Sequence, residues 1–188
     1  MQAVTADPPH DSRTGGFRIA ALRGAPTPEI QKLLAGFADR RRREGLRVAG
    51  VIEVPTVAPD GAAVSVVLRD IGNGSTFPVF QNLGRESTAC SLDSSGLAAA
   101  CQSVLRAISG GADLIVLSKF GKLEEAGSGL LHAFGAAADA GIPCVTGVAP
   151  NFAGPFMDFA GNYAQWVSAG ESALEAWWAS PGEDSAIA

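Results

Sequence analysis

The segment Asp113-Leu114-Ile115-Val116-Leu117 (DLIVL, 113–117) is the most strongly apolar stretch of the chain and predicts a buried central strand of a parallel sheet. Similar short apolar runs occur at 17–22, 47–54 and 144–148, and segments with helical periodicity lie between them. Strands that alternate with helices form a sheet with helices on both faces, because each crossover packs back on the sheet. We therefore predict an α/β fold, a three-layer sandwich with a mostly parallel sheet.

Other signals place the remaining elements around these strands. Thr27 is the predicted N-cap of a helix that ends in the run Arg40–Arg43, which we interpret as a solvated face matched to the helix dipole. Asp93 is the predicted cap of a second long helix, and Asn73-Gly74 predicts a hairpin turn. The further predictions are helices at about 127–140 and 168–180, a Pro/Gly/Phe-rich loop at 149–161 and an edge strand at 163–167.

The length and composition favour one soluble domain. The 188 residues, 47% of them hydrophobic, suffice for a sizeable core. We predict one domain at 17–180, with a disordered tail at 1–16 and a second tail at 181–188. Residues 1–16 lack the apolar region of a signal peptide, and no apolar run approaches the roughly 18 residues of a membrane span. A cytoplasmic protein is expected.

Charge and residue counts exclude several functions. Lys and Arg number 14 against 19 Asp and Glu, and the net charge of −5 argues against nucleic-acid binding. Cys90, Cys101 and Cys144 are too few for a disulfide framework and form no zinc motif. With only His10 and His132, a histidine metal site or a Ser–His–Asp triad has almost no material. We predict no metal site and no catalytic residue.

The first strand, turn and helix have the layout of a phosphate-binding loop but not its residues. A Walker A loop reads GxxxxGK[ST], in which N–H groups, a lysine and a hydroxyl face phosphate and magnesium. Gly24 is present, whereas Glu29, Ile30 and Gln31 stand where the second glycine, the lysine and the Ser/Thr belong. The helix N-terminus can still bind an anion. The alternative is a tight turn without a ligand.

A second candidate loop follows the central strand. Lys119 and Lys122 lie three residues apart, and their ammonium groups with the nearby glycine N–H groups predict an oxyanion cradle. The alternative is a pair of solvated lysines bound to Glu124 and Glu125. Ligands of open α/β sheets bind at the carboxyl ends of strands, where this loop and the Gly24 turn would meet. The predicted anion-binding residues are Arg23, Gly24, Thr27, Ser118, Lys119, Gly121, Lys122, Gly127, Ser128 and Gly129.

The polar loop at 81–93 supplies additional candidates, namely Gln81, Ser87, Thr88 and Cys90. Its alternative interpretation is an ordered surface loop, with Cys90 as a buried small residue rather than a soft ligand.

Four motifs carry a family resemblance: QNLGRESTACSLD (81–93), GADLIVLSKFGKLEEAGSG (111–129), GIPCVTGV (141–148) and the pair Trp177-Trp178. Over about 17–179 the chain resembles domain-of-unknown-function family 2478, bacterial proteins often encoded beside molybdenum-uptake genes. The family usually has Asn at the position of Ser118 and Arg at that of Ser91. The layout is more distantly similar to P-loop nucleoside-triphosphatases, which implies a P-loop-like fold with degenerate Walker motifs.

The resemblance and the residues together predict a non-catalytic accessory protein of molybdenum homeostasis that binds an oxyanion, molybdate or tungstate. The molybdenum link comes from the resemblance alone. One alternative is a nucleotide-binding protein in which Lys119 or Lys122 replaces the Walker lysine. The other is a regulatory partner protein without a small ligand, which uses Phe152, Phe156 and Phe159 as a contact surface. A homo-oligomer is compatible with each of them.

Overall fold

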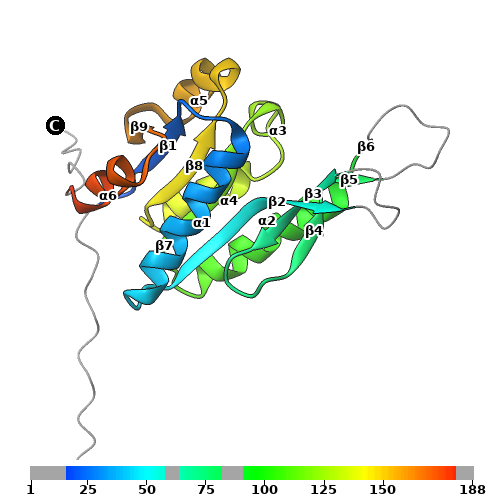
Figure 1. Cartoon of the computed structure of the whole chain (residues 1–188), viewed down its shortest axis with the longest axis horizontal. Helices are drawn as coiled ribbons and strands as arrows, with labels where there is room; N and C mark the ends of the chain where they lie inside the picture. Colours follow the sequence, from blue (N-terminus) through cyan, green and yellow to red (C-terminus); the bar gives the residue numbers. More distant parts are fainter. Residues whose placement is uncertain (1–15, 58–63, 82–90, 181–188) are drawn as a thin grey trace, which may run out of the picture.

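A seven-stranded sheet forms the centre of the molecule (Figure 1), as described by a computed structural model for residues 16–57, 64–81 and 91–180. The spatial order of the strands is β4-β3-β2-β7-β8-β1-β9, and β5 and β6 form a separate small ladder. The strands are β1 (Ile19–Arg23), β2 (Val48–Val57), β3 (Val64–Asp70), β4 (Thr76–Pro78), β5 (Phe80–Gln81), β6 (Ser91–Leu92), β7 (Leu114–Phe120), β8 (Cys144–Val148) and β9 (Ala164–Ser168).

The sheet is parallel except at one edge. β7 pairs in parallel with β2 and β8, and β1 pairs in parallel with β8 and β9. The hairpin of β3 and β4 adds to β2 in antiparallel orientation. The prediction that the four apolar runs lie parallel in one sheet is confirmed, and so are the hairpin and the edge position of β9.

Helices cover both faces of the sheet. The helices are α1 (Thr27–Arg43), α2 (Ser94–Ser109), α3 (Lys122–Glu125), α4 (Leu131–Asp139), α5 (Ala153–Ala160) and α6 (Glu171–Ala179), with single 3₁₀ turns at Pro150–Phe152 and Gly161–Tyr163. Residues of α1 and α6 share one buried core with Leu114 and Val116 of β7. Residues of α2, α4 and α5 share the other with Ile115 and Leu117. Alternate residues of one strand thus feed two cores.

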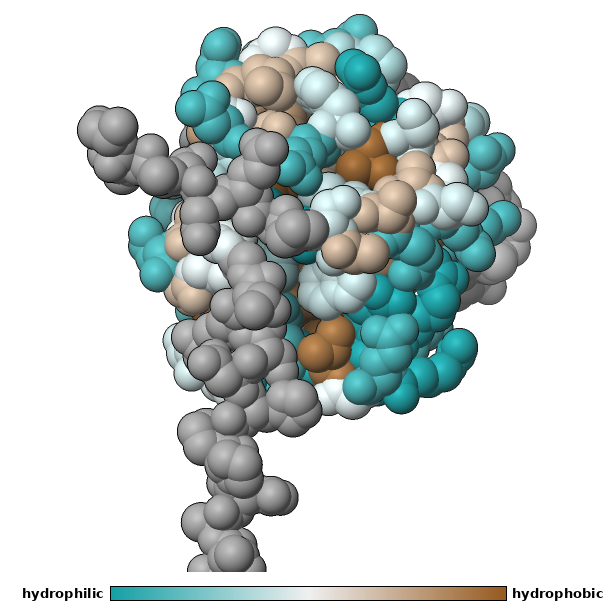
Figure 2. Space-filling model, turned by 90° about the vertical axis from the view of Figure 1, so that its left-hand side faces the viewer, coloured by the Kyte–Doolittle hydropathy of each residue, from teal (hydrophilic) through white to brown (hydrophobic). Residues whose placement is uncertain are grey.

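This arrangement confirms the predicted three-layer α/β sandwich with a mostly parallel sheet, and it agrees with a P-loop-like fold. Figure 2 views the end of the molecule beside β9 and α6, and the visible surface there is mostly hydrophilic, with small separate hydrophobic spots. Among the described residues, no helix has the length and apolar character needed to cross a membrane. The predicted tails fall outside the described residues, apart from Gly16.

Four local predictions about the elements are wrong. Thr27 is the first helical residue, and Pro26, whose extended backbone (φ −60°, ψ 149°) turns into α1, occupies the N-cap position without a side-chain hydrogen bond. The predicted helix at 127–140 is α4 alone, preceded by the short α3. The predicted loop at 149–161 contains α5. The central strand continues past Leu117 to Phe120.

The predicted start of α2 is confirmed, whereas the interpretation of the arginine run at the end of α1 is not. Asp93 caps α2 as predicted, since its carboxylate accepts hydrogen bonds from the N–H groups of Ser95 and Gly96, both at 3.0 Å. The solvated face predicted for the arginine run of α1 is wrong for Arg41, which is buried. Its Nη2 lies 2.8 Å from a carboxylate oxygen of Glu175 in α6. The run therefore joins two helices.

Candidate ligand site at the carboxyl end of the sheet

Two cavities meet at the Gly24 turn, where β1, β7 and β8 end. The first, which we call the turn cavity, has a volume of about 430 Å³. It is lined by Gly24, Ala25, Pro26, Thr27, Ile30, Gln31, Ser118, Lys119, Gly147, Val148, Ala149 and Pro150. The second, the Trp166 cavity, measures about 560 Å³ and is lined by Arg23, Gly24, Val148, Pro150, Ala153, Trp166, Ser168 and Ala169. Both lie where open α/β sheets bind ligands.

The turn before α1 offers fewer donors than its position suggests. Gly24 has φ +93°, a conformation that favours glycine. The N–H groups of Glu29 and Ile30 already donate to the Pro26 carbonyl at 3.0 and 3.1 Å, and proline at 28 has no N–H. Within the described residues, Thr27 is therefore the member of the first helical turn whose N–H group has no hydrogen-bond partner.

Gln31 is the central polar connection beneath the turn cavity. Its Nε2 donates to the Ser118 carbonyl at 2.7 Å, and its Oε1 accepts from the Glu53 N–H at 2.7 Å. The side chain is buried and ties α1 to both β7 and β2. Both ends of the amide are engaged with backbone, so Gln31 does not replace the Walker hydroxyl as a ligand for magnesium.

Lys119 lies in β7 and lines the turn cavity, and its ammonium group has a partner. Its Nζ is 2.7 Å from Oε1 of Glu53, whose side chain is only 13% exposed. This ion pair differs from the pairing with Glu124 or Glu125 that the sequence offered as an alternative. It also compensates the charge that the predicted cradle assigned to Lys119.

The segment 121–130 is organised around Glu124 and does not line either cavity. The buried carboxylate of Glu124 accepts the N–H groups of Gly121 at 3.0 Å and Leu130 at 2.9 Å. A Cβ at Gly129 would lie 2.2 Å from Glu124 Oε1, so the chain needs glycine there. Burial raises the pKa of Glu124, although these N–H groups act in the opposite direction.

The other predicted residues of this segment also lie outside the two cavities. Ser128 donates its hydroxyl hydrogen to the Leu123 carbonyl at 3.0 Å, and Lys122 is the exposed first residue of α3. Lys122, Gly127 and Ser128, like Gly121 and Gly129, do not contribute to the walls of the two cavities.

Arg23 lines the Trp166 cavity and follows directly on the turn cavity's Gly24 in the chain. Its guanidinium carbon lies 4.7 Å from the centroid of the Trp166 ring, in a cation–π contact. Within the described parts of the chain, no carboxylate forms an ion pair with Arg23. The structure therefore places one uncompensated positive charge beside the Gly24 turn.

The Walker positions hold other side chains. Ile30 packs against β8, since a Cβ at Gly147 would come within 2.8 Å of Ile30 Cγ2. Ser118, at the end of the predicted central strand, is buried. Among residues 16–57, 64–81 and 91–180, no cluster of three His, Cys, Asp or Glu side chains could hold a metal ion.

The remaining sequence candidates are only partly described. Gln81 lies in β5, and Ser87, Thr88 and Cys90 fall outside the described residues. The binding residues predicted from the sequence did not include Gln31, Glu53 or Trp166. An acid inside an otherwise apolar strand at 53 and an amide within the apolar stripe of α1 were the signals that could have found two of them.

Comparison with known proteins gives two matches. A family model described as "Protein of unknown function (DUF2478)" matches residues 19–177. The chain is 35% identical over 161 residues to the "Molybdenum import ATP-binding protein ModC 2" of Bradyrhizobium diazoefficiens. That match covers 86% of this chain but only 18% of the relative, so the chain spans less than a fifth of that protein. No solved structure matches.

Proposed function

The chain belongs to the DUF2478 family, and we propose that it binds an oxyanion, molybdate or tungstate, as a non-catalytic accessory protein of bacterial molybdenum homeostasis. The molybdenum assignment is supported by the name of the Bradyrhizobium relative, a molybdenum import protein. The ligand is a tetrahedral dianion, which suits a site with a few N–H groups, hydroxyls and one or two cations.

The observation that carries the proposal is the uncompensated Arg23 beside the Gly24 turn. Its guanidinium, the Thr27 N–H and the backbone at Gly24 are the groups we assign to the anion. Ser118 and Lys119 also line the turn cavity, and Glu53 reduces the contribution of Lys119. This set is a subset of the sequence prediction, without the residues that surround Glu124.

Catalysis finds no support in the same residues. Phosphoryl transfer needs a cation at the transferring phosphate and a held magnesium ion. Ile30 and the engaged Gln31 provide neither, and we expect negligible hydrolysis of ATP or GTP with magnesium. Nucleotide binding without hydrolysis is the second candidate, supported by the two adjoining cavities and by the words "ATP-binding" in the relative's name.

Calorimetric titration with molybdate, tungstate, sulfate and ATP tests the proposal. Each charge-assisted contact is worth roughly 1.5–3 kcal/mol, so Arg23→Gln should weaken molybdate binding about tenfold or more. Arg43→Gln is the matched control, because Arg43 is exposed at the other end of α1. Glu53→Gln releases Lys119 and should strengthen anion binding.

The outcomes separate the candidates. Tight ATP binding with no molybdate binding would replace the proposal by the nucleotide alternative. No binding of any anion would overturn both and favour the regulatory partner protein. Of the contact surface predicted for that third alternative, Phe156 is fully buried and drops out, whereas Phe159 is exposed.

A further inference from the structure

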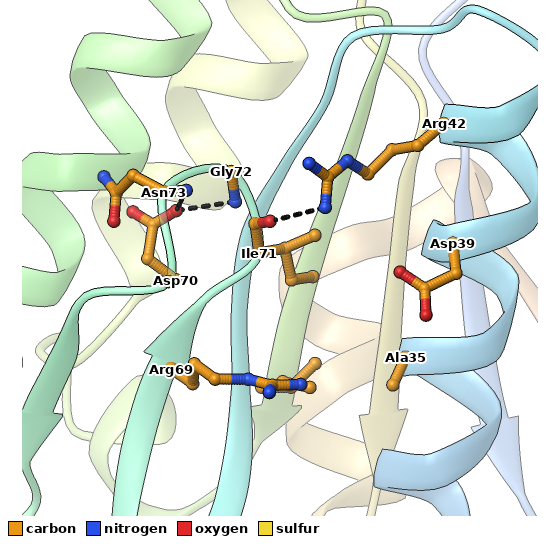
Figure 3. A pocket seen from close by; sticks show the side chains of 10 residues that line it. Ala35, Asp39, Arg42, Arg69, Asp70, Ile71, Gly72 and Asn73 are labelled. Atoms are coloured by element: carbon orange, nitrogen blue, oxygen red, sulfur yellow. Dashed lines mark hydrogen bonds between the residues drawn. The ribbon is translucent and has the colours of Figure 1, made fainter.

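A third cavity, of about 420 Å³, lies between α1 and the β3–β4 hairpin (Figure 3), and we call it the hairpin cavity. Its lining residues are Ala35, Asp39, Arg42, Ile52, Arg69, Asp70, Ile71, Gly72, Asn73 and Gly74. None of them lines the turn cavity or the Trp166 cavity. It is therefore a separate site candidate, independent of the proposed function.

The hairpin wall of this cavity is held in one conformation. One oxygen of the buried Asp70 accepts the N–H groups of Gly72 at 2.7 Å and Asn73 at 3.1 Å. The other accepts the hydroxyl hydrogen of Ser103 in α2 at 2.6 Å. The turn is thus fixed by a carboxylate anchored in a helix on the opposite face of the sheet, and its backbone is preorganised.

The helix wall is fixed to the same turn. Arg42 Nη1 donates to the Ile71 carbonyl at 3.0 Å and so closes the cavity at one end, as Figure 3 shows. The floor is apolar, because Ile52 of β2 is 3% exposed and Ala35 of α1 lies beside it.

Two opposite charges face this cavity without pairing. Asp39 projects from α1 and Arg69 from β3, and both side chains are drawn at the cavity in Figure 3. In the part of the chain that the structure describes, neither makes an ion pair or a side-chain hydrogen bond. An unpaired carboxylate and an unpaired guanidinium on opposite walls match a ligand with both charges.

We propose that the hairpin cavity binds a small zwitterion of the α-amino-acid class. The ligand's carboxylate lies on the planar fork of Arg69, which suits carboxylates, and its ammonium group lies on Asp39. Its side chain covers the apolar floor at Ile52. The two charged contacts set the orientation of the ligand, and the preorganised turn limits the loss of entropy on binding.

The test is a ¹⁵N-edited NMR titration of the full chain with L-leucine, L-glutamine and L-glutamate. We expect saturable shifts of the Gly72 and Gly74 amides for at least one of them. N-acetyl and carboxamide derivatives of the same amino acid each lack one charge. Their affinity should therefore be lower by a factor of about ten or more. Asp39→Asn and Arg69→Gln should weaken binding to a similar extent.

The control variant is Arg43→Gln, an exposed arginine of α1 that does not line the cavity. Circular dichroism melting checks that every variant is folded. The proposal is overturned if no amino acid gives saturable shifts up to about 10 mM, which corresponds to a binding free energy of only about −3 kcal/mol. It is equally overturned if the derivatives bind the parent chain as tightly as the unmodified amino acid does. The same holds if the Asp39 and Arg69 variants bind that amino acid as tightly as the parent chain does.

Discussion

Replacing Gln31 by Leu tests whether this side chain holds α1 to the sheet. Leucine keeps nearly the same volume but cannot make either of the two hydrogen bonds, both 2.7 Å long, to the Ser118 carbonyl and the Glu53 N–H. The substitution therefore removes polar contacts from a buried position with little loss of packing. It also leaves two backbone groups without their partner.

The magnitude follows from the cost of these unsatisfied groups. A lost hydrogen bond with a buried unpaired group costs about 1–3 kcal/mol. Gln31 lines the turn cavity, and water there can satisfy part of the loss, so we expect the free energy of unfolding to fall by about 2–4 kcal/mol in total. For a chain of this size, that corresponds to a decrease in Tm of about 4–16 °C.

Urea denaturation and thermal melting of Gln31→Leu beside Lys32→Ala provide the measurement. Lys32 is the exposed next residue of α1, and its replacement should change stability by less than about 0.5 kcal/mol. If Gln31→Leu is as stable as the parent chain, the two hydrogen bonds contribute nothing net, and Gln31 cannot be the connection we describe.

Two further predictions concern carboxylates. Burial raises the pKa of Glu124 above its ordinary value of 4.5, so its contribution to stability is complete below that pH and is lost as the pH rises through the folded-state pKa. In urea denaturation over that pH range, the free energy of unfolding of Glu124→Gln should depend less on pH than that of the parent chain. Parallel pH profiles of the two chains would contradict the raised pKa of Glu124. Glu175 contacts Arg40 at 2.7 Å and the buried Arg41 at 2.8 Å, so Glu175→Ala should lose about 1–3 kcal/mol in urea denaturation. Glu171 is 69% exposed and lies 3.5 Å from Arg40, so Glu171→Ala should lower the free energy of unfolding by less than about 0.5 kcal/mol. Equal losses for the two variants would refute the role given to Glu175.

The strands were predictable because a buried strand appears in the sequence as a short run of apolar residues. β8 was predicted at its observed bounds, since a strand covered on both faces is mostly apolar, with Thr146 as the polar residue here. β7 was cut short at Leu117 because Ser118 and Lys119 are polar. The strand tolerates Lys119 there because its ammonium reaches Glu53 on the neighbouring strand.

The helix α5 shows a signal that composition hid. Its Gly154 and Pro155 are typical of a loop, yet Pro155 lies in the first turn, where a missing N–H costs little. Phe152, Phe156 and Ala160 recur at intervals of four residues, and the last two are buried. Periodicity was the better guide in this segment.

The candidate site was predictable in its location but not in its charges. The sequence placed the Gly24 turn and the end of the central strand at one edge, and both line the turn cavity. It could not show that Glu53 neutralises Lys119 or that Trp166 lies beside Arg23, since these partners are far apart in the chain. Local sequence patterns indicate where a chain turns, but they do not identify which charged residue from a distant part of the chain lies next to that turn.

The strand order also constrains how the chain is assembled. β1 is an apolar strand whose two neighbours, β8 and β9, both follow every other strand in the sequence. The consecutive antiparallel strands β2, β3 and β4 can pair through local contacts as soon as they are synthesised, but β1 has no edge to join until β8 exists. During synthesis β1 therefore stays unpaired in the sheet until β8 exists, and the sheet is complete only when β9 pairs with the other side of β1.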